Sequence, residues 1–143
     1  MKISRRQSRE KTLQVLYSLQ FNKPKTIINY IQRYSDEINQ SLANDDYALK
    51  IIQGVLENVE EIDQLIKKFA NDETEETTFA DISCVDLNIM RISVYEFVIS
   101  KEVPFSISVD EAIELAKNYS AYKSKSLING ILASINEYIN GDK

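Results

Sequence analysis

Four basic residues open the first predicted helix, and their spacing places Arg5, Arg6 and Arg9 on one side of it, with Lys11 close by. A guanidinium group suits phosphate because its planar fork donates two parallel hydrogen bonds. A helix start adds free N–H donors and a positive dipole end. Tyr17 follows two turns later, where its ring could stack on a base or fill the core. We expect these five residues to contact RNA, the alternative for the basic ones being a solvated face.

A second group of polar residues lies near the C-terminus. Lys123 and Lys125 flank Ser124 before an apolar helical pattern, and Asn129 and Gly130 follow one turn later. An asparagine amide can read a base edge, and a glycine lets a backbone approach closely. Tight helix–helix packing explains Gly130 equally well, and Asn129 could instead bond a neighbouring loop. We place both lysines, and Asn129 with them, in the candidate RNA site.

Charged residues also occur within and beside an apolar helical stretch. Arg91 and Glu96 are five residues apart, too far round a helix to pair, so each needs a partner on another helix. Asp81, Asp86 and Glu102 form a candidate face for a basic protein partner. Simple solvation is the other interpretation of these three carboxylates.

The net charge of −5 is distributed unevenly along the chain. Residues 1–25 carry seven basic residues and one acidic residue, a net charge of +6, while the remainder carries ten basic and 21 acidic residues, a net charge of −11. Such asymmetry is typical of a local anion-binding site on an acidic body.

The composition argues against catalysis. The chain has no histidine and one cysteine, so a zinc site, a Ser-His-Asp triad and a Cys-His pair are excluded. Its three glycines form no phosphate-binding loop motif. We expect no enzymatic activity, cofactor or metal. The sequence also lacks an apolar run of 18 residues and a secretion signal, so we expect a cytoplasmic protein that does not enter a membrane.

Apolar residues recur with a period near 3.6 almost throughout, and only two prolines interrupt the chain. The pattern predicts an all-α fold in one domain, 1–143, with helical subdomains at about 1–70 and 79–141 around an acidic linker at 71–78. In the first half of the chain we expect a helix at 4–21, a second that bears Ile27, Ile31 and Tyr34, and a long third from Asn44 to Phe69. In the second half we expect a helix at 82–100 and one that runs to 119 from a capping box at Ser108 to Glu111. The last helix should start at 124 and end at Gly141.

These residues resemble, in order and spacing, the pattern of the NusB family. The resemblance covers nearly the whole chain, with a tolerant patch at about 22–46. Its motifs are Arg5-Arg6-x-x-Arg9-Glu10, Leu13-Gln14-x-Leu16-Tyr17, Gly54-Val55, Ile62-Asp63, Val85-Asp86, Ile89-Met90-Arg91, Val94-Tyr95-Glu96, Val103-Pro104, Asp110 to Lys117 and Ile128-Asn129-Gly130-Ile131-Leu132. The chain departs from the family at Thr77 and Asp81, where a tryptophan and an arginine are common, and at Leu127, where an aromatic residue is usual.

The resemblance implies a compact bundle of about six to seven helices in two packed subdomains, without catalytic activity. It implies a transcription antitermination factor that binds boxA-type single-stranded RNA together with the small-subunit ribosomal protein NusE. This pair acts within the RNA polymerase antitermination complex on ribosomal RNA operons. A homodimer that buries the RNA face is also possible.

Two rival functions remain open. A protein-interaction module of the same fold that has lost RNA binding would fit the departures and the acidic body. An RNA methyltransferase fragment would need a glycine-rich cofactor loop downstream, and this sequence contains none.

Overall fold

The computed structural model describes residues 4–21, 45–70 and 79–141. Within these ranges the chain forms helices and turns without a strand, which confirms the all-α prediction. The region around Ile27, Ile31 and Tyr34 and the linker at 71–78 lie outside the described residues. The elements are α1 (Arg5–Phe21), α3 (Asp46–Glu57), α4 (Val59–Ala70), the 3-10 turn η1 (Phe79–Asp81), α5 (Cys84–Val94), the π-helix η2 (Tyr95–Ile99), α6 (Phe105–Tyr119) and α7 (Ser124–Ile139).

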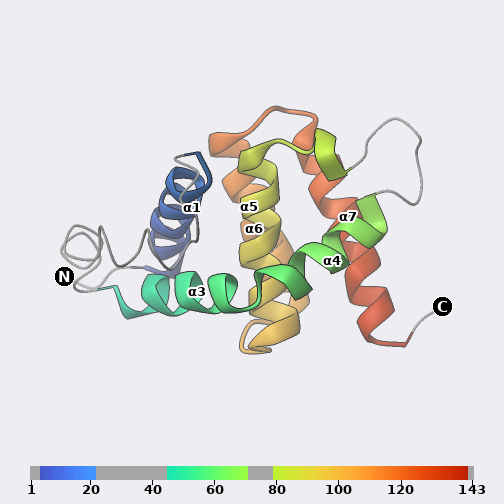
Figure 1. The fold of residues 1–143 in the computed structure, drawn as a ribbon, viewed down its shortest axis with the longest axis horizontal. Helices are drawn as coiled ribbons and strands as arrows, with labels where there is room; N and C mark the ends of the chain where they lie inside the picture. The colour runs from blue at the N-terminus through green and yellow to red at the C-terminus, as the bar shows by residue number, and fades with distance from the viewer. Residues whose placement is uncertain (1–3, 22–44, 71–78, 142–143) are drawn as a thin grey trace.

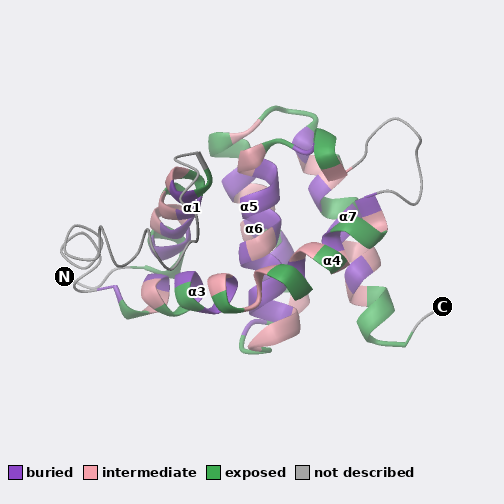
Figure 2. Ribbon diagram, in the orientation of Figure 1, coloured by how far each residue is buried: buried purple, intermediate pink, exposed green. Residues whose placement is uncertain are grey.

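Helix α5 occupies the middle of the molecule, with α1 on one side and α7 on the other (Figure 1). From Asp86 to Val94 it is buried at every residue but Arg91 (Figure 2). A helix buried on all sides needs apolar neighbours all round, which the surrounding helices supply. It continues into η2, so the predicted helix over 82–100 exists but changes its hydrogen bonding at Tyr95.

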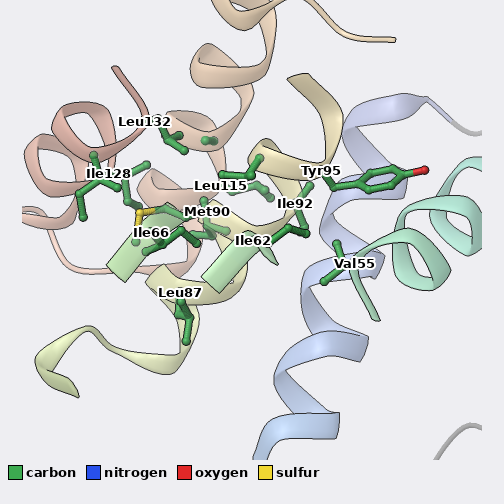
Figure 3. Packing of buried hydrophobic residues seen from close by; sticks show 14 of the residues in the cluster. Val55, Ile62, Ile66, Leu87, Met90, Ile92, Tyr95, Leu115, Ile128 and Leu132 are labelled. Atoms are coloured by element: carbon green, nitrogen blue, oxygen red, sulfur yellow. The ribbon is translucent and has the colours of Figure 1, made fainter. Parts of the chain in front are cut away.

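One hydrophobic cluster connects the six α-helices of the described residues. Figure 3 shows Ile66, Met90 and Ile128 meeting from α4, α5 and α7, while Val55 and Tyr95 extend the cluster toward α1 and α3. The two predicted subdomains therefore share a core, although the boundary between them stays a prediction. Removing a large buried side chain from such a core costs about 2–5 kcal/mol.

The predicted long helix from Asn44 to Phe69 is wrong in one respect, because it is two helices that meet at Asn58 (Figure 1). The Asn58 side-chain amide donates to the Gly54 carbonyl at 2.7 Å, and its backbone N–H is shared between the carbonyls of Gly54 and Val55. An asparagine that bonds the backbone of the preceding turn competes with regular helix, so the axis changes direction here. The predicted start is confirmed: Asp45 caps α3 by accepting from the Ala48 N–H at 3.1 Å.

The predicted capping box at Ser108 is also wrong. Helix α6 begins three residues earlier, at Phe105, directly after Pro104. The Ser108 hydroxyl is buried inside the helix, where it bonds Ser93 and Glu96, while Glu111 faces α1. A Ser-x-x-Glu pattern therefore does not mark a helix start when both side chains have partners on other helices.

The two chain-terminal helices have the predicted ends. Ser4 caps α1, its hydroxyl accepting from the Gln7 N–H at 3.1 Å. Helix α7 ends at Ile139, and Gly141 follows with φ +81°, a left-handed conformation that favours glycine.

Candidate nucleic-acid interface

The first turn of α1 presents two exposed arginines. The Arg5 guanidinium lies over the Tyr47 ring of α3, with Cζ 4.6 Å from the ring centroid. The Arg6 side chain, 59% exposed, forms a bidentate pair with Glu111 of α6 at 2.7 and 3.1 Å. The hydrogen bond from Arg6 lowers the pKa of Glu111, and the same bond raises the pKa of Arg6. Glu111, which we had interpreted as a capping residue, instead neutralises part of this basic surface.

Arg9 lies inside the protein rather than on its surface. It is 4% exposed, and its guanidinium bonds Glu96 at 2.8 Å and Glu111 at 3.3 Å. Glu96 also accepts from the hydroxyls of Tyr47 and Ser108, at 2.5 and 3.0 Å. Burial, together with the hydrogen bond to Glu96, raises the pKa of Tyr47. This network joins α1, α3, η2 and α6, and it fulfils the expectation that Glu96 needs a partner on another helix.

The outer face of α1 leads from the arginines toward the C-terminal end of α6. Glu10 on this face accepts from the Tyr119 hydroxyl at 2.7 Å, and that bond raises the pKa of Tyr119. Tyr17 follows Glu10 by two turns and is 37% exposed, as is Tyr119. Lys11 is half-buried beside them. Glu10 of α1 thus lies at the C-terminal end of α6, while Arg6 and Arg9 bond Glu111 two turns earlier on α6.

The turn from Ser120 to Ser124 joins α6 to α7 and is anchored to α5. Asp86, 4% exposed, accepts hydrogen bonds from the hydroxyls of both Ser120 and Ser124, the latter at 2.6 Å. We had placed Asp86 on a partner-binding face, but the structure places it inside. Because Asp86 bonds both ends of the turn, it holds the residues between them in one orientation.

Lys123 is exposed in this turn, and Lys125 follows in the first turn of α7. Between α6 and these lysines lies Tyr122, 85% exposed, with the Lys125 Nζ 4.5 Å from its ring centroid. Sequence reasoning missed Tyr122. The signal was present, since Tyr122 is an aromatic residue beside a lysine in a short segment between two apolar helical patterns.

Asn129 and Gly130 lie on the exposed side of α7. A Cβ atom built on Gly130 meets nothing within 4 Å, so tight helix packing does not explain this glycine. Within the described residues the Asn129 side chain has no hydrogen-bond partner, so the loop-bonding interpretation finds no support. This face of α7 is open to a ligand.

The acidic candidates outside this area are exposed but separate. Asp81 ends η1, and Glu102 pairs with Lys50 of α3. Arg91 has the partner on another helix that we expected, because it forms a bidentate pair with Asp63 of α4 at 2.7 and 2.8 Å.

The described residues contain neither a cluster of metal ligands nor a helix suited to span a membrane. No group of Cys, Asp and Glu side chains in them is arranged to hold a metal ion. None of their helices is both long and apolar enough to cross a membrane.

Similarity to known proteins extends over most of the chain. The model of the NusB family matches residues 6–137. A transcription antitermination protein NusB of Acetivibrio thermocellus is 38% identical, over 93% of this chain and 88% of the relative. The protein of the same name from Thermodesulfovibrio yellowstonii is 34% identical, over 93% of this chain and 91% of the relative.

Solved structures agree with these relatives. T. maritima NusB is 32% identical with a TM-score of 0.75, covering 94% of this chain and 92% of the other. A complex of antitermination factors NusB and NusE with double-stranded RNA contains a chain with a TM-score of 0.74 over 94% of this chain and 96% of that one. At 23% identity the latter shows the shared fold alone. The family model and the relatives lead to one conclusion: this chain belongs to the NusB family.

Proposed function

We propose that this chain is a transcription antitermination factor that binds boxA-type single-stranded RNA together with the ribosomal protein NusE. In this role it acts in the cytoplasm, as part of the RNA polymerase antitermination complex, and promotes transcription of ribosomal RNA operons. It does so by binding and without catalysis. The relatives that are named transcription antitermination proteins support this role.

The observation that carries the RNA-binding part is that α1, which bears the first basic region, contacts the end of α6, which leads to the second basic region at the start of α7. Arg5, Arg6 and Lys11 lie on α1, and Lys123 and Lys125 lie at the start of α7. The hydrogen bond between Tyr119 and Glu10 joins the end of α6 to α1, so the turn that leads to Lys123 starts beside the first region. An RNA strand that spans both regions would pass Tyr17 and reach Asn129.

Affinity for RNA alone should be modest. Glu111 already pairs with Arg6, and Arg9 is bonded to two carboxylates, so few cations remain for phosphates. Binding that neutralises few phosphates weakens with salt at a slope of about −0.7 per phosphate for single strands. A protein partner that holds unpaired bases would supply specificity, as recognition of single-stranded RNA usually requires. We propose that Asp81 and Glu102 form part of the face for that basic partner. Asp86 supports the turn from Ser120 to Ser124 from inside the protein.

A protein-interaction module without RNA binding is the alternative. The exposed acidic residues and Leu127, half-buried against the core, favour it. Self-association is a further possibility, and sedimentation of the free protein would measure it.

A gel shift with boxA-type RNA, with and without the NusE-type protein and at two salt concentrations, tests the proposal. We expect tighter, salt-dependent binding in the ternary mixture. The double variant Arg5→Glu/Lys123→Glu should lose most of this binding, whereas Lys67→Glu, a charge reversal on exposed α4, should not. Recovery of the ribosomal protein by wild type without any RNA shift at low salt would favour the interaction module instead.

A further inference from the structure

Tyr122 is the most exposed of the large hydrophobic residues in the described part of the chain, at 85%. Single exposed aromatic residues are common on proteins and need no function. Tyr122 differs from the others in its surroundings. It stands in a turn whose two ends are both bonded to the buried carboxylate of Asp86. Because the turn is already held in place, a ligand that binds the ring would lose little conformational entropy of the protein in doing so.

The ring also has a cation beside it and an open helix face next to it. The Lys125 ammonium lies 4.5 Å from the ring centroid, and at 85% exposure most of the remaining ring surface is accessible. Asn129 follows Lys125 by four residues, so the two share one face of α7. Gly130 adjoins that face and has open space where a side chain would stand. The Tyr122 ring and the Lys125 ammonium are therefore in contact, and Lys125 shares its helix face with the Asn129 amide, next to the unobstructed Gly130.

This combination matches the chemistry of a nucleotide in a single strand. An aromatic side chain stacks on any base because every base has a π-face, and lysines beside it attract the phosphates. Leu127, which stands where the family usually has an aromatic residue, packs against the hydrophobic core. It offers no ring for stacking. Tyr122 can supply the missing ring from a different position in the chain.

We propose that Tyr122 is the base-stacking residue of the RNA site, with Lys125 against the ring and Asn129 at the edge of the stacked base. This inference rests on the proposed function, because it names how the same site holds an unpaired base. It assigns a contact to a residue outside the sequence motifs of the family resemblance.

The test compares substitutions of Tyr122 with the same substitutions of Tyr138. Tyr138 is 51% exposed near the other end of α7, so it serves as a matched control. We expect Tyr122→Ala to weaken binding of boxA-type RNA, in the presence of the NusE-type protein, by about 5- to 150-fold. Tyr122→Phe should bind within about twofold of wild type because it keeps the ring. Tyr138→Ala should match wild type, and circular dichroism should show all three variants folded.

Two further readouts separate stacking from charge. The slope of log affinity against log salt should stay unchanged in Tyr122→Ala, since stacking releases no counterions, and should become shallower in Lys123→Gln. The chain contains no tryptophan, so Tyr122→Trp introduces a single tryptophan, which can be excited selectively over the tyrosines. Its fluorescence should be quenched by the RNA, while that of Tyr138→Trp should not.

The outcomes distinguish this inference from the proposed function. If Tyr122→Ala binds RNA like wild type while Arg5→Glu/Lys123→Glu does not, the stacking role is wrong and the RNA-binding function stands. If Tyr122→Ala weakens binding of the ribosomal protein when no RNA is present, Tyr122 contacts that protein and the inference also fails. If wild type binds no RNA under any condition, the proposed function fails first.

Discussion

The two basic regions of this molecule differ in how much of their charge the fold itself uses. On α1, Arg9 is buried against Glu96 and Glu111, and Arg6 is paired with Glu111 on the surface. Only Arg5 of the three arginines lacks a carboxylate partner among the described residues, and it lies over an aromatic ring. At the start of α7, Lys123 and Lys125 have no acidic partner in the described part of the chain.

The comparison teaches that a count of basic residues overstates the charge available to an anion. Arginine suits buried ion pairs because its planar fork bonds carboxylates bidentately, whereas lysine stays hydrated on the surface. Much of the charge of the arginine-rich helix start is therefore used by the fold, while the charge of Lys123 and Lys125 stays available to an anion.

The largest effect should come from Arg9→Met. Removing this buried cation leaves Glu96 without its charged partner, and breaking a buried pair in this way costs about 3–5 kcal/mol of unfolding free energy. Arg5→Met, which removes one cation–π contact, should cost less than about 1 kcal/mol. Urea denaturation followed by circular dichroism measures both. Equal, small losses would show that Arg9 is not structural and return it to the RNA-contact group.

The sequence predicted that Glu96 and Arg91 need partners, because a charge inside an apolar helix requires one. It could not identify those partners, since Arg9 is 87 residues from Glu96 and Asp63 is 28 residues from Arg91. Pairings over such distances are decided by helix packing. The same reason explains why the prediction for Asp86 was wrong. Its carboxylate was expected to face a protein partner, but it accepts hydrogen bonds from two hydroxyls more than 30 residues away.

Local patterns succeeded where the side chain acts on its own backbone. Ser4, Asp45 and Gly141 mark helix ends as predicted, because capping is a local interaction. The pattern at Ser108 failed because both its side chains bond other helices, and Pro104, a residue that favours helix starts, marked the true beginning. Apolar periodicity could not show the break at Asn58, because the buried residues of α3 and α4 continue with the same spacing of three and four along the chain.

Asp86→Ala should have the second-largest effect. It leaves the hydroxyls of Ser120 and Ser124 without their acceptor, at a cost of about 1–3 kcal/mol. If the turn serves binding, RNA affinity should fall too, although Asp86 cannot reach a ligand from inside the protein. Thermal unfolding and a gel shift, both at a temperature where the variant is folded, measure the two losses. A stable variant with full RNA affinity would show that the turn needs no anchor.

The two helical glycines provide a smaller test. Gly130→Ala should raise the unfolding free energy by about 0.5–1 kcal/mol, since alanine favours a helix and the added Cβ meets nothing. Gly54→Ala should destabilise by about 1–3 kcal/mol, because its Cβ would lie 2.0 Å from the Tyr95 ring. Chemical denaturation measures the unfolding free energy of both variants. If Gly130→Ala is more stable but binds RNA less tightly, the RNA backbone comes close to α7 at this point.

The smallest effect concerns the pH dependence of the Arg6–Glu111 pair. Because the bond from Arg6 lowers the folded-state pKa of Glu111, the carboxylate contributes stability above its unfolded pKa of about 4.3. That contribution disappears as the pH falls through the folded-state pKa. Glu111→Gln should therefore be less stable than wild type near pH 7 and should converge with it in acid. Meanwhile its RNA affinity at pH 7 should rise, because Arg6 no longer has a competing carboxylate. Unfolding curves from pH 7 to 2 and a gel shift at pH 7 measure both changes. An unchanged RNA affinity would mean that Arg6 serves the fold alone, leaving binding to Arg5 and the lysines.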